Sequence, residues 1–240
     1  DINMEKSTLK EITSIVLPNG ENIPTLDAYL RLVATKPNTR LILEMKSLSD
    51  LKREDLAAEK IVKALRKYNL LDRTDIIAFS INACLAFKKL MPDGRIFYLN
   101  GDLAPRSIKK LGLTGIDYSM SVLRKNPKWV EQAHKEGLEV NVWTVDTEED
   151  MRYFIDLGVD YITTDYPERL QAAEITIVAL YTTRAVRFSR TVLVLRANFQ
   201  PVRLIRHSAS TIPFAAYRAD VLQKSFRTSL RIPLHRDWQP

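Results

Sequence analysis

The stretch EVNVWTVDTEEDMRYFIDLGVDYITTDY, residues 139–166, reads as a strand, a helix and a second strand in that order. Residues 139–145 and 160–166 are short and rich in Val, Ile and Tyr, which is typical of strands buried in a parallel sheet. The segment 147–157 opens with Thr147 and acidic residues and stops at Gly158, a pattern that predicts a capped helix. Such a unit predicts two parallel strands joined by a crossover helix.

The same alternation extends toward the N-terminus. Four more strands are predicted, at residues 41–46, 75–80, 95–100 and 115–120. Amphipathic or capped helices are predicted between them, at residues 54–69 (with Leu56, Ile61, Val62 and Leu65 on one stripe), 83–91, 105–111 from Pro105, and 127–136 with Asn126 as N-cap. Repeated β/α units give either a doubly wound sheet or a (β/α)8 barrel, and the lack of a Gly-rich loop after the first strand favours the barrel.

Two charged residues share one face at the end of the first predicted strand. Glu44 and Lys46 are two residues apart, so their side chains point the same way. One interpretation is a buried ion pair that closes the barrel, and the other is a metal-ligand carboxylate beside a phosphate-binding lysine. The sequence leaves both open.

Polar residues recur at the other strand ends, where a barrel carries its active site. They are Ser80, Asn100, Asp117 with Ser119, Asn141 with Trp143, and Thr163 with Asp165. Trp143 is expected either to wall a pocket or to fill the core. His134 is expected on a solvated helix face, whereas Cys84 lies among apolar neighbours and is expected to be a buried structural thiol.

Charge divides the chain into two parts. Residues 175–240 contain ten Arg, Lys224 and two acidic residues, whereas residues 1–174 have a net charge of −2. We therefore expect a domain over residues 1–174 and an Arg-rich tail over residues 175–240. No apolar run predicts a transmembrane helix, the first residues lack a signal-peptide core, and one cysteine excludes an internal disulfide.

Several blocks of this sequence resemble a glycerophosphodiester phosphodiesterase domain. They are IPTL at 23–26, EMK at 44–46, WTVD at 143–146, and GVD through TDYP at 158–167. The resemblance covers about residues 7–173, with Asp146 in place of a more common Asn.

The resemblance implies a metal-dependent hydrolase of lipid metabolism that splits glycerophosphodiesters into glycerol 3-phosphate and an alcohol. Glu44 would be a ligand of Ca²⁺ or Mg²⁺, Lys46 would hold the phosphate, and Trp143 would wall the substrate pocket. Relatives are exported, to the periplasm or outside the cell, or cytoplasmic.

The family's His-Arg-Gly and Glu-x-Asp motifs and its second histidine are not present. We therefore expect a TIM (β/α)8-type barrel lacking its first two strands, with open sheet edges, an incomplete cation site and no diesterase activity. The alternatives are a non-catalytic truncated or decayed barrel module, and an aldolase-type barrel in which Lys46 forms a Schiff base.

The tail has three interpretations. It is an extension without a selected function, a basic segment that contacts an anionic membrane or nucleic acid, or a pair of strands or helices that covers the open barrel.

Overall fold

The computed structural model describes residues 3–173, 191–196 and 230–233, the last two segments by their backbone. The elements, in chain order, are α1 (Leu9–Thr13), α2 (Leu26–Ala34), β1 (Thr39–Met45), α3 (Leu51–Lys67), the 3-10 helix η1 (Leu71–Arg73), β2 (Thr74–Ala78), α4 (Ile81–Leu90), β3 (Arg95–Tyr98), α5 (Pro105–Lys110), β4 (Gly115–Ser119), α6 (Met120–Lys125), α7 (Lys128–Lys135), β5 (Glu139–Trp143), α8 (Glu148–Leu157), β6 (Tyr161–Thr164), β7 (Thr191–Arg196) and β8 (Leu230–Pro233). Residues 167–173 are also helical.

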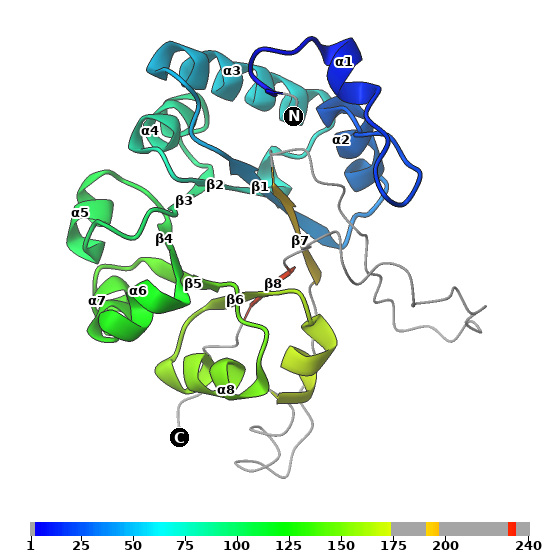
Figure 1. Ribbon diagram of the computed structural model, residues 1–240. Coiled ribbons are helices and arrows are strands. Elements are labelled where there is room, and N and C mark those ends of the chain that lie inside the picture. The colour runs from blue at the N-terminus through cyan, green and yellow to red at the C-terminus, as the bar shows by residue number, and fades with distance from the viewer. Residues whose placement is uncertain (1–2, 174–190, 197–229, 234–240) are drawn as a thin grey trace.

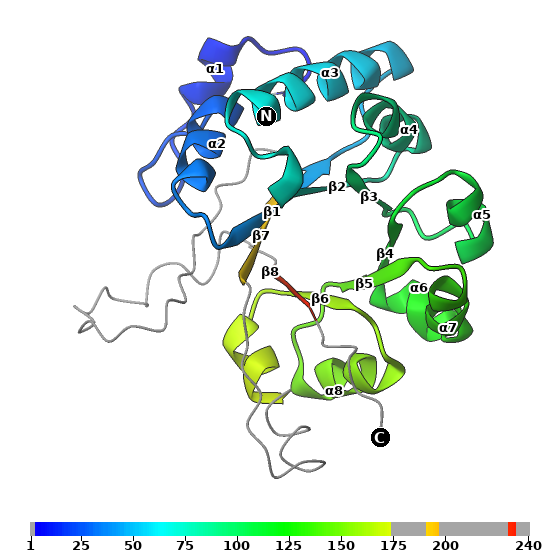
Figure 2. The ribbon, with the colours of Figure 1, turned by 180° about the vertical axis from the view of Figure 1, so that it is seen from behind.

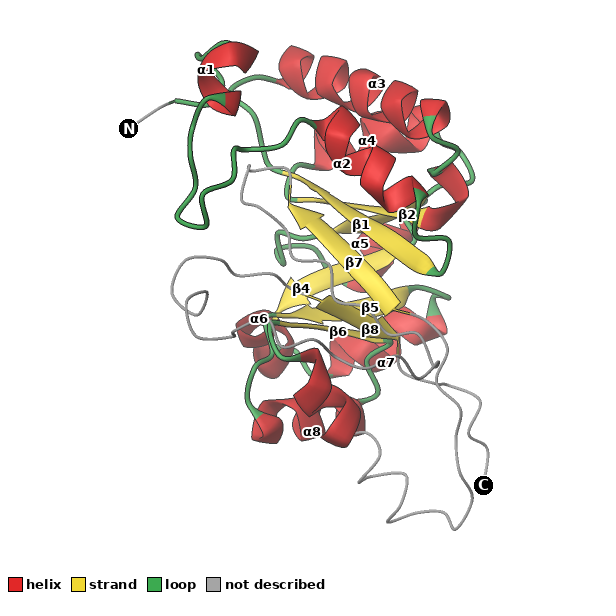
Figure 3. Cartoon of the chain, turned by 90° about the vertical axis from the view of Figure 1, so that its right-hand side faces the viewer, coloured by secondary structure: helices red, strands yellow, loops and turns green. Residues whose placement is uncertain are grey.

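Strands β1 to β6 are parallel neighbours in chain order. Helices α3 to α8 lie around the outside of these strands, as seen from both ends of the barrel (Figures 1 and 2). Seen from the side, helices cover the strands above and below (Figure 3). The six predicted strands and the barrel-type arrangement are therefore confirmed, and the doubly wound alternative is wrong.

The edges of the six-stranded sheet differ from the open edges that we expected. β7 pairs in parallel with β1, β8 pairs antiparallel with β6, and β7 and β8 pair with each other. The backbone thus forms a closed ring, because two short strands from residues 175–240 occupy the gap. Of the three interpretations of the tail, this pairing agrees with the covering strands. The remaining tail residues lie outside the described part.

Alternation along each strand divides the core into two layers. One set of side chains, including Leu41, Leu43 and Ile76, packs between the strands and the helices. The residues between them point into the barrel, where Ile42, Ile77, Phe97 and Leu99 form a second, smaller cluster. Because the side-chain period of a strand is two, the same alternation decides which polar residues face the barrel interior.

Ion pairs close the barrel where its strands begin. Asp75, which is 1% exposed, accepts hydrogen bonds from Arg40 Nε at 2.6 Å and Arg95 Nε at 2.9 Å. Both terminal nitrogens of Arg95 also donate hydrogen bonds to Glu139. One of them donates to Tyr161 Oη as well, at 3.1 Å. These residues hold β1, β2, β3, β5 and β6 together at the amino-terminal end, which leaves the carboxyl end for a site.

Three details of the predicted helices were wrong. Leu56 is 49% exposed, and Glu54 and Ala58 lie on the buried face of α3 with Ile61. Asn126 does not cap α7; it ends α6, a helix that the sequence analysis missed, and its Nδ2 donates to Val122 O. The predicted caps of α8 are confirmed, since Thr147 accepts from Asp150 N and Gly158 adopts φ +83°.

Cys84 is buried on α4, as predicted, and we expect it to resist labelling. Burial, with a smaller effect from the charge of Glu54, raises the pKa of Cys84 to about 12, so the thiol stays neutral at pH 8. Because the thiolate is the reactive form, labelling of the native protein by an aromatic disulfide reagent should be about a thousandfold slower than in urea. Equal rates with and without urea would contradict the buried position.

Among the residues that the structure describes, no helix has the length and apolar character needed to cross a membrane.

Candidate functional site

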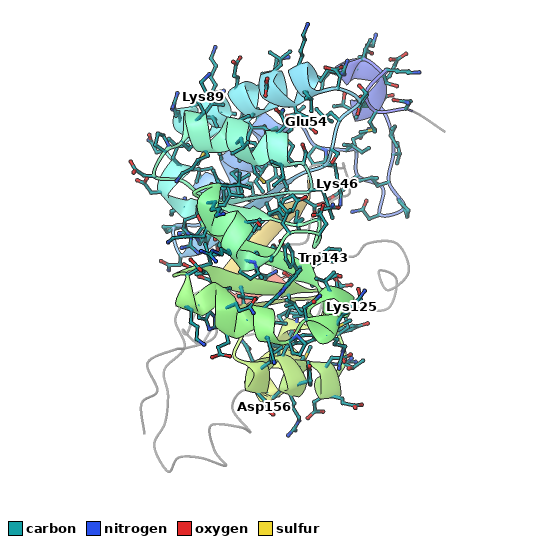
Figure 4. The ribbon with its side chains drawn as sticks, turned by 90° about the vertical axis from the view of Figure 1, so that its left-hand side faces the viewer. Lys46, Glu54, Lys89, Lys125, Trp143 and Asp156 are labelled. Carbon is teal, nitrogen blue, oxygen red and sulfur yellow. The ribbon has the colours of Figure 1, made fainter. Side chains whose placement is uncertain are left out.

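A cavity of about 160 Å³ opens where the strands end. It is lined by Glu44, Lys46, Ile77, Phe79, Leu99, Asp117, Trp143 and Thr163. Lys46 and Trp143 lie at the same end of the barrel, whereas Lys89, at the end of α4, lies toward the opposite end (Figure 4). The structure therefore brings Glu44, Lys46 and Trp143 to one pocket, and the metal-binding and substrate-binding roles given to them stay predictions.

Glu44 and Lys46 form an ion pair at the wall of the cavity. The Glu44 side chain is 3% exposed and pairs through Oε1 with Lys46 Nζ, whereas the Lys46 side chain is 29% exposed. The ammonium also lies 4.5 Å from the centroid of the Phe79 ring, a cation–π contact. A buried carboxylate needs a partner, and Lys46 provides it while keeping donors available at the cavity.

Trp143 walls the pocket rather than filling the core. Its Nε1 donates to Asp117 O at 2.8 Å, and its ring meets Phe79 edge to face, with centroids 6.0 Å apart. Both contacts fix the plane of the indole, which is half-buried beside the opening. A fixed aromatic face offers apolar contact to the carbon part of a ligand.

Asp117 and Thr163 give the cavity a polar side, and Asn141 lies hydrogen-bonded between them. Asp117 on β4, Asn141 on β5 and Thr163 on β6 are all buried. The Asn141 Nδ2 group donates to Asp117 Oδ1 and, at 2.9 Å, to Thr163 Oγ1. The sequence indicated that all three lie at strand ends, but nothing in it connected them with one another.

The other predicted strand-end residues lie elsewhere. Ser80 and Ser119 are the N-caps of α4 and α6, and Asn100 is exposed. Asp165 is half-buried, and its backbone N–H donates at 2.8 Å to Asp146 Oδ1, so the Asp that replaces the usual Asn supports the end of β6. These residues serve the strand-to-helix turns and do not line the cavity.

Glu54 supports the pocket from behind, and the sequence analysis missed it. This carboxylate is 2% exposed and accepts hydrogen bonds from Ser80 Oγ at 2.6 Å, Asn82 Nδ2 at 3.2 Å and Leu48 N at 3.3 Å. It therefore ties the loop after Lys46 to the start of α4. The sequence did contain a sign of this role, because Glu54 has the same helical spacing as the buried residues of α3.

The described residues do not assemble a cation site around Glu44. Within residues 3–173, 191–196 and 230–233, no group of three His, Cys, Asp or Glu side chains is placed to hold a metal ion. Glu44 is paired with Lys46 instead. The residues present do not fit a Ca²⁺ or Mg²⁺ ion, which takes several oxygen ligands, and a metal-ligand role for Glu44 stays a prediction.

The histidines do not reach the cavity in the part of the chain that is described. His134 lies on α7, and its Nε2 is 3.1 Å from Asp160 Oδ2, with 27% of the side chain exposed. The expectation that His134 lies on a solvated helix face is therefore corrected: the side chain is only partly exposed, because Asp160, just before β6, faces this helix. His207 and His235 lie outside the described residues.

Parallel β/α units around a cavity at the carboxyl ends of the strands define a TIM-barrel-type protein, with its pocket at the end where such barrels carry their active sites. The chain belongs to the glycerophosphoryl diester phosphodiesterase family, whose model matches residues 3–169. A glycerophosphodiester phosphodiesterase of Caldanaerobacter subterraneus subsp. tengcongensis is 33% identical over 155 residues, which are 63% of this chain and 61% of the relative. The chain thus spans about three fifths of the length of that relative.

Solved structures agree with the fold. A glycerophosphodiester phosphodiesterase from Parabacteroides distasonis superposes with a TM-score of 0.71 and 40% identity, over 75% of this chain and 74% of the other. A phosphodiesterase from Oleispira antarctica, solved with the product sn-glycerol-3-phosphate, superposes with a TM-score of 0.62 at 20% identity, over 71% of each chain. The likeness to the second protein shows the fold alone. The family assignment favours the phosphodiester interpretation of Lys46 over the Schiff-base one.

Proposed function

We propose that this chain binds glycerophosphodiesters in the Glu44–Lys46–Trp143 pocket and carries the substrate-binding part of a glycerophosphodiester phosphodiesterase site. One observation carries the proposal: Lys46 presents a partly exposed ammonium at a cavity walled by Trp143, at the carboxyl end of the strands. The family hydrolyses glycerophosphodiesters to glycerol 3-phosphate and an alcohol, and its named relatives are phosphodiesterases.

The pocket residues divide the work of binding. Lys46 is assigned to the phosphate oxygens, because an ammonium donates up to three hydrogen bonds to an anion. Glu44 orients Lys46 through their ion pair, and Trp143 packs against the carbon skeleton of the ligand. A divalent cation would supply polarisation of the phosphate in this chemistry, but the described residues do not form its site, and we assign them no bond-cleaving step.

Removal of the Lys46 charge should weaken phosphate binding. A charge-assisted hydrogen bond contributes about 1.5–3 kcal/mol, so Lys46→Met should weaken the binding of glycerol 3-phosphate by about 10- to 100-fold in titration calorimetry. Lys89→Met is the matched control, since Lys89 lies toward the opposite end of the barrel (Figure 4), and it should bind as the unmodified protein does. An equal loss in both variants would place the phosphate elsewhere.

A non-catalytic binding module is the second candidate, and the lack of a cation site among the described residues favours it for this chain. With glycerophosphocholine and either Ca²⁺ or Mg²⁺, we expect release of glycerol 3-phosphate at the rate of the buffer blank. Turnover that Glu44→Gln abolishes would refute this expectation and establish a working catalytic centre.

A further inference from the structure

We propose that the end of the barrel opposite the pocket docks onto an anionic lipid membrane. The docking surface, called the basic face, is formed by Arg66 on α3, Lys88 and Lys89 on α4, and Lys109 and Lys110 on α5. It lies where the strands begin, whereas the pocket opens where they end. The inference therefore concerns a second surface and does not depend on the proposed phosphate pocket.

The direction of the helices brings these residues to the same end of the molecule. Each helix starts where one parallel strand ends and returns toward the start of the next, so the last turns of α3, α4 and α5 lie near the starts of β2, β3 and β4. The three helices follow one another around the strands (Figures 1 and 2). Lys89 accordingly lies away from the end that carries Lys46, Trp143 and Lys125 (Figure 4).

Contacts between neighbouring helix ends make the basic face continuous. Arg66 Nη2 donates at 2.9 Å to the carbonyl of the last residue of α4. A Cβ placed on Gly112 would lie 3.8 Å from Lys88 Cε, so the Lys88 side chain reaches the turn after α5. A Cβ placed on Gly137 would lie 3.7 Å from Lys109 Nζ, so the Lys109 side chain reaches the turn after α7. The five cations thus form one arc over four adjacent helix ends.

The basic face carries charge that carboxylates do not neutralise. Its exposed lysines, Lys89, Lys109 and Lys110, have no carboxylate partner among the described residues. The other two members donate to backbone carbonyls. Asp93 is the only carboxylate in the turns that lead from α4 to β3 and from α5 to β4. Residues 1–174 have a net charge of −2, so a general excess of basic residues does not explain this concentration.

Compensation of the helix dipoles does not explain the arrangement either. A cation in the last turn stabilises the negative end of a helix, and the dipole grows with the number of aligned peptides. Yet α5, which has only six residues, ends in both Lys109 and Lys110, whereas α8, with ten residues, has no cation in its last turn. The lysines therefore follow the position of the helix around the barrel.

The chemistry of the basic face favours a lipid membrane over nucleic acid. Four of its five members are lysines, and clusters of this size are attracted to anionic lipid headgroups. Proteins that bind single-stranded nucleic acid stack bases on aromatic side chains, and duplex DNA is read by a helix or β-ribbon that enters a groove. The basic face consists of blunt helix ends, and residues 66–75, 88–95 and 109–115 include no exposed aromatic side chain. A bilayer surface requires neither feature.

The test is sedimentation of the full chain with vesicles of phosphatidylcholine, either alone or mixed with phosphatidylglycerol. We expect binding to the mixed vesicles only, and loss of this binding at high salt, because salt screens the attraction. A lysine near an anionic bilayer contributes about fivefold in affinity. The triple variant Lys89→Gln/Lys109→Gln/Lys110→Gln should therefore bind mixed vesicles on the order of a hundredfold more weakly.

Lys52→Gln/Lys125→Gln/Lys128→Gln is the matched control. It removes the same charge from three exposed lysines near the start of α3, at the end of α6 and at the start of α7, on the pocket side of the barrel. It should retain most of the binding to mixed vesicles. Circular dichroism verifies that both triple variants are folded. The test contains no free phosphate ester, so its failure leaves the proposed pocket standing, and the reverse also holds.

The remaining outcomes overturn the proposal. No binding to mixed vesicles, or equal losses in the two triple variants, would refute the basic face and assign any vesicle binding to other cations, such as the Arg-rich tail. Equal binding to vesicles of phosphatidylcholine alone would refute the electrostatic basis. Binding to duplex DNA that is tighter than binding to mixed vesicles, and that the basic-face variant loses, would replace the lipid membrane with nucleic acid as the partner.

Discussion

Asp75→Ala is expected to lower the free energy of unfolding by about 3–5 kcal/mol, because removing one member of a buried ionic network leaves its partners uncompensated. Asp75 is 1% exposed and joins Arg40 and Arg95 where β1, β2 and β3 begin. Burial alone would lower the pKa of Arg95, but the hydrogen bond with Glu139 and the charge of Asp75 raise it, so the guanidinium stays charged. Without Asp75, two cations face one another across β2.

Asp27→Ala is the control, because Asp27 has the same number of cationic partners as Asp75 but is far less buried. Asp27 also pairs with two cations, Arg31 at 2.8 Å and Lys67 at 2.5 Å, but its side chain is 42% exposed. Solvent screens such pairs, so Asp27→Ala should change stability far less. Asp75→Asn keeps the shape and removes the charge, and it should fall between the two. Urea unfolding followed by circular dichroism measures all three, and equal losses for Asp75→Ala and Asp27→Ala would contradict the network's role.

The strand order was readable from the sequence because each strand is short and apolar and a helix separates it from the next strand. The pairing of Glu44 with Lys46 was also predictable, since it needs only the two-residue period of a strand. Trp143 lines the same cavity as Glu44 and Lys46, whereas its role toward a substrate stays a prediction. Local periodicity was sufficient wherever the partners are close in sequence.

Contacts between distant strands were not readable in this way. Asp117, Asn141 and Thr163 are separated by more than 20 residues from one another, and only the register of β4, β5 and β6 brings them together. The ion pairs of Asp75 depend on the registers of β1 with β2 and of β2 with β3. A charged residue at the start of a strand can be recognised in the sequence. Its partner cannot, because the register and closure of the sheet determine which side chains meet.

Phe97→Ala is expected to cost about 3–5 kcal/mol of stability, the usual loss when a buried aromatic ring is truncated in a core. Phe97 is fully buried at the centre of the barrel, where it packs with Ile42, Ile77 and Leu99. The space left by the ring cannot be filled by a shift of the backbone, because β3 is hydrogen-bonded to β2 on one side and to β4 on the other. Leu85→Ala on α4 is the control: Leu85 is 42% exposed, and a surface truncation should stay within about 0.5 kcal/mol.

The double variant Asp75→Ala/Phe97→Ala tests whether the ion pairs of Asp75 and the apolar interior around Phe97 stabilise the barrel cooperatively. Arg95 Cζ lies 5.4 Å from the centroid of the Phe97 ring, and Arg95 Nε donates a hydrogen bond to Asp75. One side chain therefore contacts both the ion pairs and the apolar interior. Residues that share a partner couple by about 0.5–3 kcal/mol in double-mutant cycles, and a coupling in this range is expected here. Strictly additive losses in urea unfolding would mean that the ion pairs and the apolar interior stabilise the barrel independently. The contact between Arg95 and the Phe97 ring would then add nothing measurable to stability.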